Sequence, residues 1–445
     1  MLWDKYQLYK NSFAWQKYAY IEESSFLNIY AYFVGVKKLK KRNNRALNIK
    51  GAVLGDEQLK VYMEKIAANH DLSNVSDIST YPIPRVKENF RFIEKTYDLL
   101  NEHMKLNIDI YPAGEWLLDN FYIIEETVKT VTRELPEKKY KNLLGLQNNQ
   151  YNGYARIYVL ATEIVSYTDS KITDEVLNLS ILGYQKRRIL NMEEIWNLWV
   201  FLEIAIIENI RNICEKIYLA QMQKYKVESI VERLVEQKPY ESLKFINSNN
   251  KVDSAISYKE MKYPFIEYMS YKLKQYGKQG LPYLDVLEKQ VNKMGMTITE
   301  VITKEHFDIA LAKVSLGNGI TSMKEILRVN FLSLFEKVNG VEEILKKDPI
   351  NVYEKMDYKT KDYYRNKIKK ISEETRISEI YIANKALDLA KENYEKEKSE
   401  ERSEDREINK RSHIGYYLIS DGISDLHLSL TDGTGTNIKV KQGRR

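Results

Sequence analysis

The stretch that most limits how this chain can fold is the apolar run from Ile195 to Ile213, which predicts a helix with hydrophobic side chains on nearly every side. Asn191 precedes the run and Glu194 follows three residues later, a spacing typical of a capping box at a helix start. Such a helix must lie in the middle of a bundle, because any open side would leave apolar surface in water. The sequence therefore predicts a helical protein built around this segment.

A few polar residues interrupt the apolar run. They would be costly to bury without partners, so we expect a hydrogen-bonded network with two other predicted helices, the one that begins after Tyr111 and the one that carries Arg156. The residues are Glu203, Glu208, Asn209 and Arg211.

A second helix is predicted from about Pro112, because proline is well tolerated in the first turn of a helix. Apolar side chains recur at spacings of four and three residues from Leu117 to Val131, which makes one continuous stripe that must be buried. Trp116, Asn120 and Ile123 widen this buried face. The opposite side carries an ordered polar edge, which consists of Glu115, Asp119, Tyr122 and Glu126.

The polar edge has two interpretations that spacing alone does not separate. In the first, the carboxylates are solvated or pair with cations of neighbouring helices, and the favoured pairing joins Glu115 or Asp119 to Arg156 or Arg211. In the second, the edge is the wall of a sugar or partner site, where Trp116 and Tyr122 stack and Glu115 and Asp119 accept hydrogen bonds from hydroxyls.

The rest of the chain continues the helical pattern, and no segment predicts a sheet. Helices are expected between residues 56 and 106 on both sides of a loop at 73–84, with polar or Gly/Pro breaks separating those that follow. We expect an all-α fold of antiparallel helix pairs. The later helices are predicted at 220–237, 257–276, 283–294, 304–314, 321–337 and 341–347.

Four regions are expected along the chain. The first is an aromatic and basic N-terminal segment at 1–50, and the second is one helical domain at 51–390. A linker of mixed charge follows at 391–412. Residues 413–445 are expected to be a polar, disordered tail.

Charge and cysteine content exclude several classes of protein. The 69 Lys and Arg residues exceed the 63 Asp and Glu residues by only six, which is too mild a bias for a nucleic-acid-binding protein. The single cysteine, Cys214, excludes an intramolecular disulfide and a cysteine-rich metal site, and its apolar context suits a buried thiol in a reducing compartment. We therefore expect a cytoplasmic location.

No stretch of eighteen or more uncharged apolar residues occurs, so no membrane span is predicted. The basic run at 37–45 follows an apolar segment, an order opposite to that of a secretion signal. This run is either a solvated basic face or a peripheral anchor on the inner face of an anionic membrane. The cations of such an anchor would be Lys37, Lys38, Lys40, Lys41 and Arg42.

Six segments of the chain, taken in order, share their wording with one kind of protein. They are PAGEWLLDNFYIIEE (112–126), NGYARIYVLATEIVSYTD (152–169), NMEEIWNLWVFLEIAIIENIRNI (191–213), SLGNGITSMKEI (315–326), DPINVYEKMDYKTKDYYR (348–365) and HIGYYLI (413–419). Together they resemble the N-terminal cytoplasmic region of the cyclic β-1,2-glucan synthases, which are large bacterial membrane glycosyltransferases. The resemblance implies a helical region that precedes a membrane-spanning segment, a transferase domain, and cyclisation and phosphorylase-like domains. None of these follows here, which suggests a split, truncated or frame-shifted product with a transferase encoded separately.

The sequence predicts no catalytic, metal or cofactor site. Processive glycosyltransferases need a D-x-D motif for the metal on the nucleotide diphosphate and a Q-x-x-R-W helix, and the chain contains neither. Its five histidines are scattered without ligand spacing, and no nucleophile–base pair is recognisable.

Three functions therefore remain as expectations. The leading one is a non-catalytic helical region of a cyclic β-1,2-glucan synthase-like protein, which acts as a scaffold or handles β-1,2-glucan and has no activity alone. The second is a free-standing helical protein that binds or hydrolyses carbohydrate through carboxylates near Glu115. The third is a basic interaction protein that acts through residues 37–45.

Overall fold

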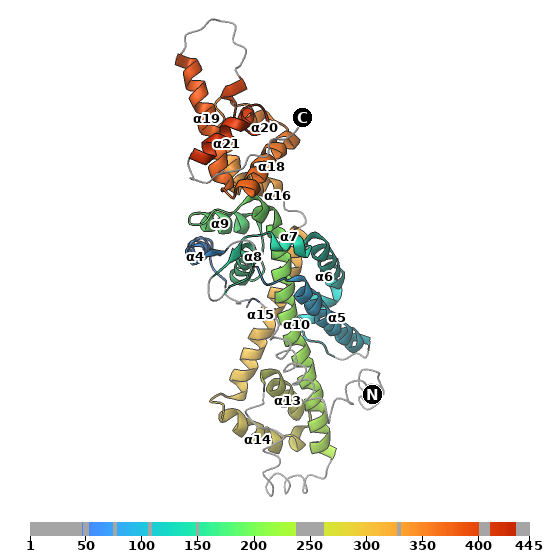
Figure 1. Cartoon of the computed structure of the whole chain (residues 1–445). Coiled ribbons are helices and arrows are strands. Elements are labelled where there is room, and N and C mark those ends of the chain that lie inside the picture. Colours follow the sequence, from blue (N-terminus) through green and yellow to red (C-terminus); the bar gives the residue numbers. More distant parts are fainter. Residues whose placement is uncertain are drawn as a thin grey trace. The chain divides into compact units, whose positions relative to one another are not determined.

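The structure is a computed structural model that describes residues 47, 53–73, 78–105, 109–147, 151–236, 262–326, 331–399 and 410–432. These ranges are almost entirely helical (Figure 1), so the predicted all-α fold is confirmed. The described strands are two residues each: β1 (Leu72–Ser73) pairs antiparallel with β2 (Gly145–Leu146). None of the described helices has the length and hydropathy that a membrane crossing requires. The basic run at 37–45 lies outside the described residues.

The described chain divides into two compact units, each assembled from separate stretches, rather than the single domain expected at 51–390. Unit 1 comprises the described residues within 1–54, 71–173 and 199–328, and unit 2 those within 55–70, 174–198 and 329–445. Helical periodicity is a local property, so it predicted the helices but not this interleaved grouping.

Unit 1 consists of the helices that pack on most of α10, together with the strand pair. Its elements are β1, α5 (Ile83–Lys105), α6 (Gly114–Glu134), α7 (Glu137–Lys141), β2, α8 (Arg156–Tyr167), α10 (Met192–Glu236, from Trp199 onward), α13 (Tyr263–Gln275), the 3₁₀ turn η2 (Gly277–Gln279), α14 (Leu281–Asn292) and α15 (Ile298–Ile326).

The helix predicted to be central is central in unit 1, because every residue of α10 from Val200 to Glu208 is buried. It is longer than expected, since the helices predicted before 213 and at 220–237 form one continuous α10. Cys214 is a buried free thiol on this helix, as predicted, and burial raises its pKa.

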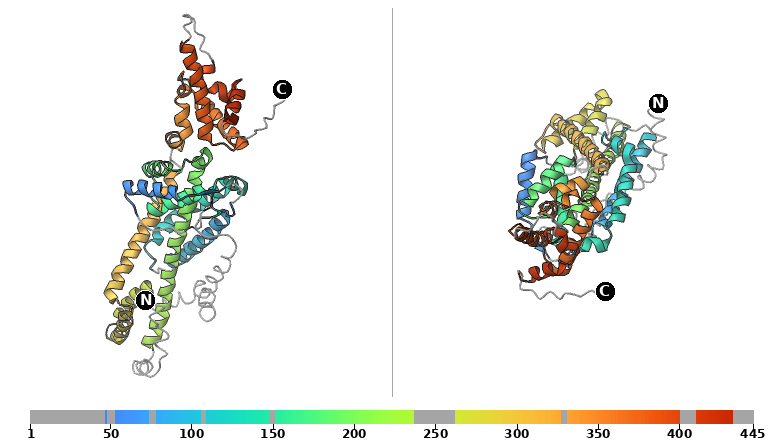
Figure 2. Two further views of the ribbon diagram at one scale, coloured as in Figure 1. Left: turned by 60° about the vertical axis from the view of Figure 1, so that its left-hand side comes forward. Right: turned by 90° about the horizontal axis from the view of Figure 1, so that it is seen from above.

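Helix α15 runs beside α10 (Figure 1, and the left view of Figure 2) and is continuous through two glycines that were expected to break it. A Cβ atom at Gly319 would lie 3.3 Å from Ile206, so a glycine here lets the two helices approach closely. Gly317 lies against the indole of Trp116 on α6 in the same way. These glycines therefore serve helix packing rather than helix termination.

Unit 2 consists of α4 and α9, the first residues of α10, and the C-terminal helices. Its elements are α4 (Asp56–Ala68), α9 (Asp174–Gln185), α16 (Phe331–Val338), α17 (Gly340–Leu345), η3 (Tyr353–Lys355), α18 (Tyr358–Thr375), α19 (Glu379–Ser399), η4 (Lys410–Ser412), α20 (Ile414–Ile419) and α21 (Ile423–Asp432).

The start of α10 has the predicted capping box in unit 2. The Asn191 backbone N–H donates to the Glu194 carboxylate at 2.9 Å, and the Glu194 N–H donates to Asn191 Oδ1 at 2.8 Å. The next free N–H, that of Met192, donates to Glu379 of α19 at 2.9 Å. These bonds satisfy backbone N–H groups that have no partner within the helix, and the bond to Glu379 connects α19 to the start of α10.

A buried ion pair lies among the C-terminal helices of unit 2. The Arg365 guanidinium donates twice to the Glu342 carboxylate, at 2.8 and 2.9 Å, and both side chains are almost fully buried. The Tyr353 hydroxyl donates to the same carboxylate at 2.8 Å. The guanidinium also lies over the ring of Phe335, 5.1 Å from its centroid. The arrangement joins α16, α17, η3 and α18.

The tail expected to be disordered is folded as far as Asp432, so that prediction is wrong for 413–432. His413 bonds Asp348 through Nδ1 and Tyr364 through Nε2, each at 2.9 Å, and the Ile414 N–H donates to Asp348 at 2.9 Å. Helices α20 and α21 bury several apolar side chains. The fully buried ones are Ile414, Leu418, Leu426 and Leu430. Similarly, α19 extends to Ser399 into the expected linker.

Candidate functional site

The predicted site residues all lie in unit 1 but occupy four separate places, so they do not form one network. Glu208 and Arg211 face α5, Asn209 faces the turn after α8, Arg156 is buried at the start of α8, and the remainder lie on the outer side of α6. The last group is Glu115, Trp116, Asp119 and Asn120; of these, Trp116 and Asn120 were predicted to widen the buried face of α6, but Trp116 is exposed and Asn120 is half-buried.

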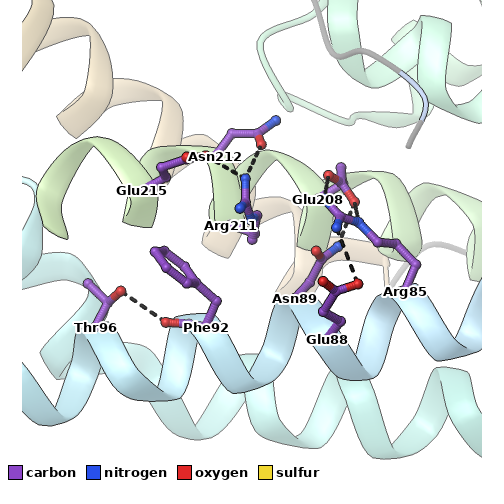
Figure 3. A network of polar contacts seen from close by, with 9 residues as sticks. All are labelled: Arg85, Glu88, Asn89, Phe92, Thr96, Glu208, Arg211, Asn212 and Glu215. Atoms are coloured by element: carbon purple, nitrogen blue, oxygen red, sulfur yellow. Dashed lines mark hydrogen bonds and ion pairs between the residues drawn. The ribbon is translucent and has the colours of Figure 1, made fainter. Parts of the chain in front are cut away.

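Glu208 on α10 is the acceptor at the centre of a polar network with α5 (Figure 3). Arg85 donates to both carboxylate oxygens, from Nε at 3.1 Å and from Nη2 at 2.8 Å, and Asn89 Nδ2 donates at 2.6 Å. The side chains of Arg85 and Glu208 are only 15% and 7% exposed. Burial alone would lower the pKa of Arg85, but the bonds and charge of Glu208 raise it.

Arg211 lies one turn further along α10 and forms a local pair, not the predicted contact with the acids of α6. Its guanidinium bonds Glu215 at 2.5 Å and lies over the Phe92 ring, 5.1 Å from the ring centroid (Figure 3). The α10 network therefore uses α5, which the sequence did not single out. The spacing of Arg85 and Asn89, four residues apart on one helical face, is the signal that could have found it.

Asn209 joins α10 to α15 and to the turn that follows α8. Its amide donates to Ser170 Oγ at 2.7 Å and to Ser315 Oγ at 3.1 Å. Ser322 on α15 donates to the Ser170 carbonyl at 2.6 Å and accepts from the Ile172 N–H at 2.9 Å. These serines were not predicted from the sequence, because a lone serine carries little pattern information.

Arg156 is buried in α8, with 1% of its surface exposed, whereas Asp119 is exposed on α6. Among the described residues, no cation lies within ion-pair distance of Asp119. The predicted pairing of Asp119 with Arg156 is therefore wrong. Helical periodicity placed both residues on helices but could not show that the outer side of α6 faces away from α8.

The outer side of α6 instead meets lysines of α15. Glu115 pairs with Lys313 at 3.4 Å, and both side chains are about half exposed. Lys324 donates to Asn120 Oδ1 at 3.0 Å, while Asn120 Nδ2 donates to the Trp116 carbonyl at 3.1 Å. Exposed pairs of this kind contribute little to stability, so this face is open for other contacts.

Glu203 is the exception among the four polar residues that interrupt the apolar run, because it is fully buried and neither carboxylate oxygen has a hydrogen-bond partner among the described residues. Burial raises the pKa of Glu203 to about 8. The folded protein therefore holds this carboxyl in its neutral form at pH 7.

Replacing Glu203 with glutamine is expected to remove part of the pH dependence of stability. The carboxyl ionises near pH 4.5 in the unfolded chain and near pH 8 in the folded one. Its contribution to the stability of the folded state is therefore fully present below pH 4.5 and is lost as the pH rises to 8. Between pH 4.5 and pH 8, urea denaturation should show the free energy of unfolding of the wild type falling by about 4 kcal/mol more than that of Glu203→Gln. Glu288→Gln, on the exposed side of α14, should follow the wild type. Parallel curves for Glu203→Gln and wild type would contradict a neutral Glu203.

The fold and these contacts define an all-α protein in which most predicted polar residues join helices. No family model matches the chain. The chain is similar to the cyclic β-(1,2)-glucan synthase NdvB of Rhizobium meliloti (strain 1021), at 23% identity over 308 residues. This alignment covers 69% of the chain but only 11% of that synthase. The similarity supports a distant relation to a glucan synthase.

Proposed function

We propose that this chain is a non-catalytic helical region of a cyclic β-1,2-glucan synthase-like glycosyltransferase, and that it provides a scaffold and a glucan-handling surface. The observation that carries the proposal is the similarity to the glucan synthase over 69% of the chain. Its partner would be a membrane glycosyltransferase domain, and the substrate of the assembly would be β-1,2-glucan.

The contacts of unit 1 support a scaffold role, because segments that resemble the synthases pack on one another. The segment 315–326 supplies Ser315 to Asn209, Gly317 to Trp116, and Gly319 to Ile206. These partners belong to the resembling segments 191–213 and 112–126. These contacts serve the packing of helices, which supports the proposed scaffold role.

The same relation holds in unit 2. The segment 348–365 contributes Asp348, which bonds His413 of the segment 413–419, and Arg365, which pairs with Glu342. Gly415 lies so close to Tyr364 that a Cβ there would be 2.1 Å from the hydroxyl oxygen. A glycine at this position lets α20 approach α18, which again favours a structural role.

A cellular experiment tests the proposal. Deleting the coding sequence in the producing bacterium should lower the β-1,2-glucan content of cell extracts, and expression of the full chain from a plasmid should restore it. An unchanged glucan content after deletion would overturn the proposed function.

The isolated chain is expected to transfer no glucose from a nucleotide-sugar donor, because its sequence has no D-x-D motif to hold the metal on the diphosphate. The measurement is incorporation of labelled glucose into polymer with Mg²⁺ or Mn²⁺, with a β-1,2-gluco-oligosaccharide as acceptor. Incorporation above that of a heat-denatured sample would contradict a non-catalytic role.

A further inference from the structure

We propose that Trp116 on α6 is a stacking platform for a saccharide ring, in a binding site shared with the adjoining face of α15. The site consists of Glu115, Trp116, Asp119, Tyr122 and Lys313. The choice of a β-1,2-linked glucan as ligand rests on the proposed function, whereas the saccharide class follows from the chemistry of the site.

The indole of Trp116 is both supported and accessible. It lies against α15 at Gly317, where a Cβ atom would be 3.5 Å from Cε2 and Cζ2 of the ring, an ordinary contact distance. At the same time, 36% of the residue remains exposed. An aromatic ring held by a neighbouring helix presents its free surface at little entropic cost, as stacking on a sugar requires.

The polar groups next to the ring suit hydroxyls. Glu115 and Asp119 lie one residue before and three residues after Trp116 on α6, and Lys313 reaches Glu115 from α15 at 3.4 Å. A sugar hydroxyl both donates and accepts, so it needs acceptors and donors side by side. The carboxylates supply the acceptors and the lysine ammonium supplies donors.

The mixture of charges separates a saccharide from other ligands. Charged residues are depleted from the cores of protein interfaces, which disfavours a protein partner centred on Trp116. Glu115, Asp119 and Glu126 on one side of α6 would repel the phosphates of a nucleic acid. A neutral ligand with many hydroxyl groups can form hydrogen bonds with these charged side chains and carries no phosphates that the carboxylates would repel.

Tyr122 extends the site along α6. It is 65% exposed and lies six residues beyond Trp116, which corresponds to about 9 Å along the helix axis and about 120° around it, on the side that carries Glu115 and Asp119. A second stacking position at this separation would contact a different ring of the same oligosaccharide. The site therefore favours a chain of several sugar units over a monosaccharide.

The test is a calorimetric titration of the full chain with linear β-1,2-gluco-oligosaccharides. Trp116→Ala should weaken binding at least tenfold, Asp119→Asn several-fold, and Trp116→Phe less than Trp116→Ala. The matched control is Tyr271→Ala, which removes a half-exposed aromatic side chain from α13 and should leave the affinity unchanged. Circular dichroism would verify that every variant is folded, and equal affinity of Trp116→Ala and wild type would overturn the inference.

The outcome is distinguishable from that of the proposed function. If plasmid-borne wild type restores the glucan content of the deletion strain but the purified chain binds no oligosaccharide, the saccharide platform is wrong and the scaffold stands. If the chain binds the oligosaccharide through Trp116 but deletion leaves the glucan content unchanged, the platform stands and the proposed function is wrong.

Discussion

Replacement of Glu208 with alanine is expected to lower the free energy of unfolding by about 3 kcal/mol. Arg85 and Asn89 together direct three hydrogen bonds at this carboxylate, and Asn89 is buried. Without Glu208, a largely buried guanidinium would keep only its contact to Glu88 at 3.4 Å. Urea denaturation followed by circular dichroism measures the change.

A double-mutant cycle separates the pair from its surroundings. Arg85→Ala and Glu208→Ala should each destabilise unit 1, while the double variant should lose much less than their sum, which gives a coupling energy of about 1–3 kcal/mol. The control is Glu125→Ala on α6, which breaks a half-exposed pair with Lys129 and should cost about 0.5 kcal/mol. Additive effects of Arg85 and Glu208 would refute their assignment as a coupled ion pair.

Removal of residues 413–445 is expected to destabilise unit 2 by about 5 kcal/mol or more and to lower its thermal midpoint by several degrees. The deleted part includes Ile414, Leu418, Leu426 and Leu430, which are all fully buried, and each contributes about 1.5–3 kcal/mol before the entropy of ordering the chain is subtracted. Differential scanning calorimetry measures the shift.

A matched pair of substitutions on α21 tests the same packing without a deletion. Leu426 is fully buried and Leu428 is 64% exposed, so Leu426→Ala should cost about 2–5 kcal/mol and Leu428→Ala less than 0.5 kcal/mol. Equal effects of the two substitutions, together with an unchanged midpoint after the deletion, would mean that α20 and α21 do not pack on unit 2.

The outer side of α6 illustrates how far sequence reasoning reaches into the candidate site. Periodicity placed Glu115 and Asp119 on the polar side of a helix, and the structure has both exposed there. Their neighbours could not be predicted, since Lys313 lies 198 residues from Glu115 and belongs to a helix whose predicted boundaries were too short. Contacts between helices depend on how their surfaces cross, which a single segment does not encode.

The sequence by itself determined the helical class, the capping box at Asn191 and the burial of α10, because helix periodicity and caps depend on residues within a few turns of one another. It also required partners for Glu208, Asn209 and Arg211, since an unpaired buried polar group is costly, whereas Glu203 is buried without one among the described residues. Only the tertiary structure decided that the partner of Glu208 is Arg85, 123 residues away, and that α20 and α21 fold onto unit 2. The physical reason is that a buried polar side chain needs a hydrogen-bond partner, and the packing of helices that are distant in the sequence decides which residue becomes that partner.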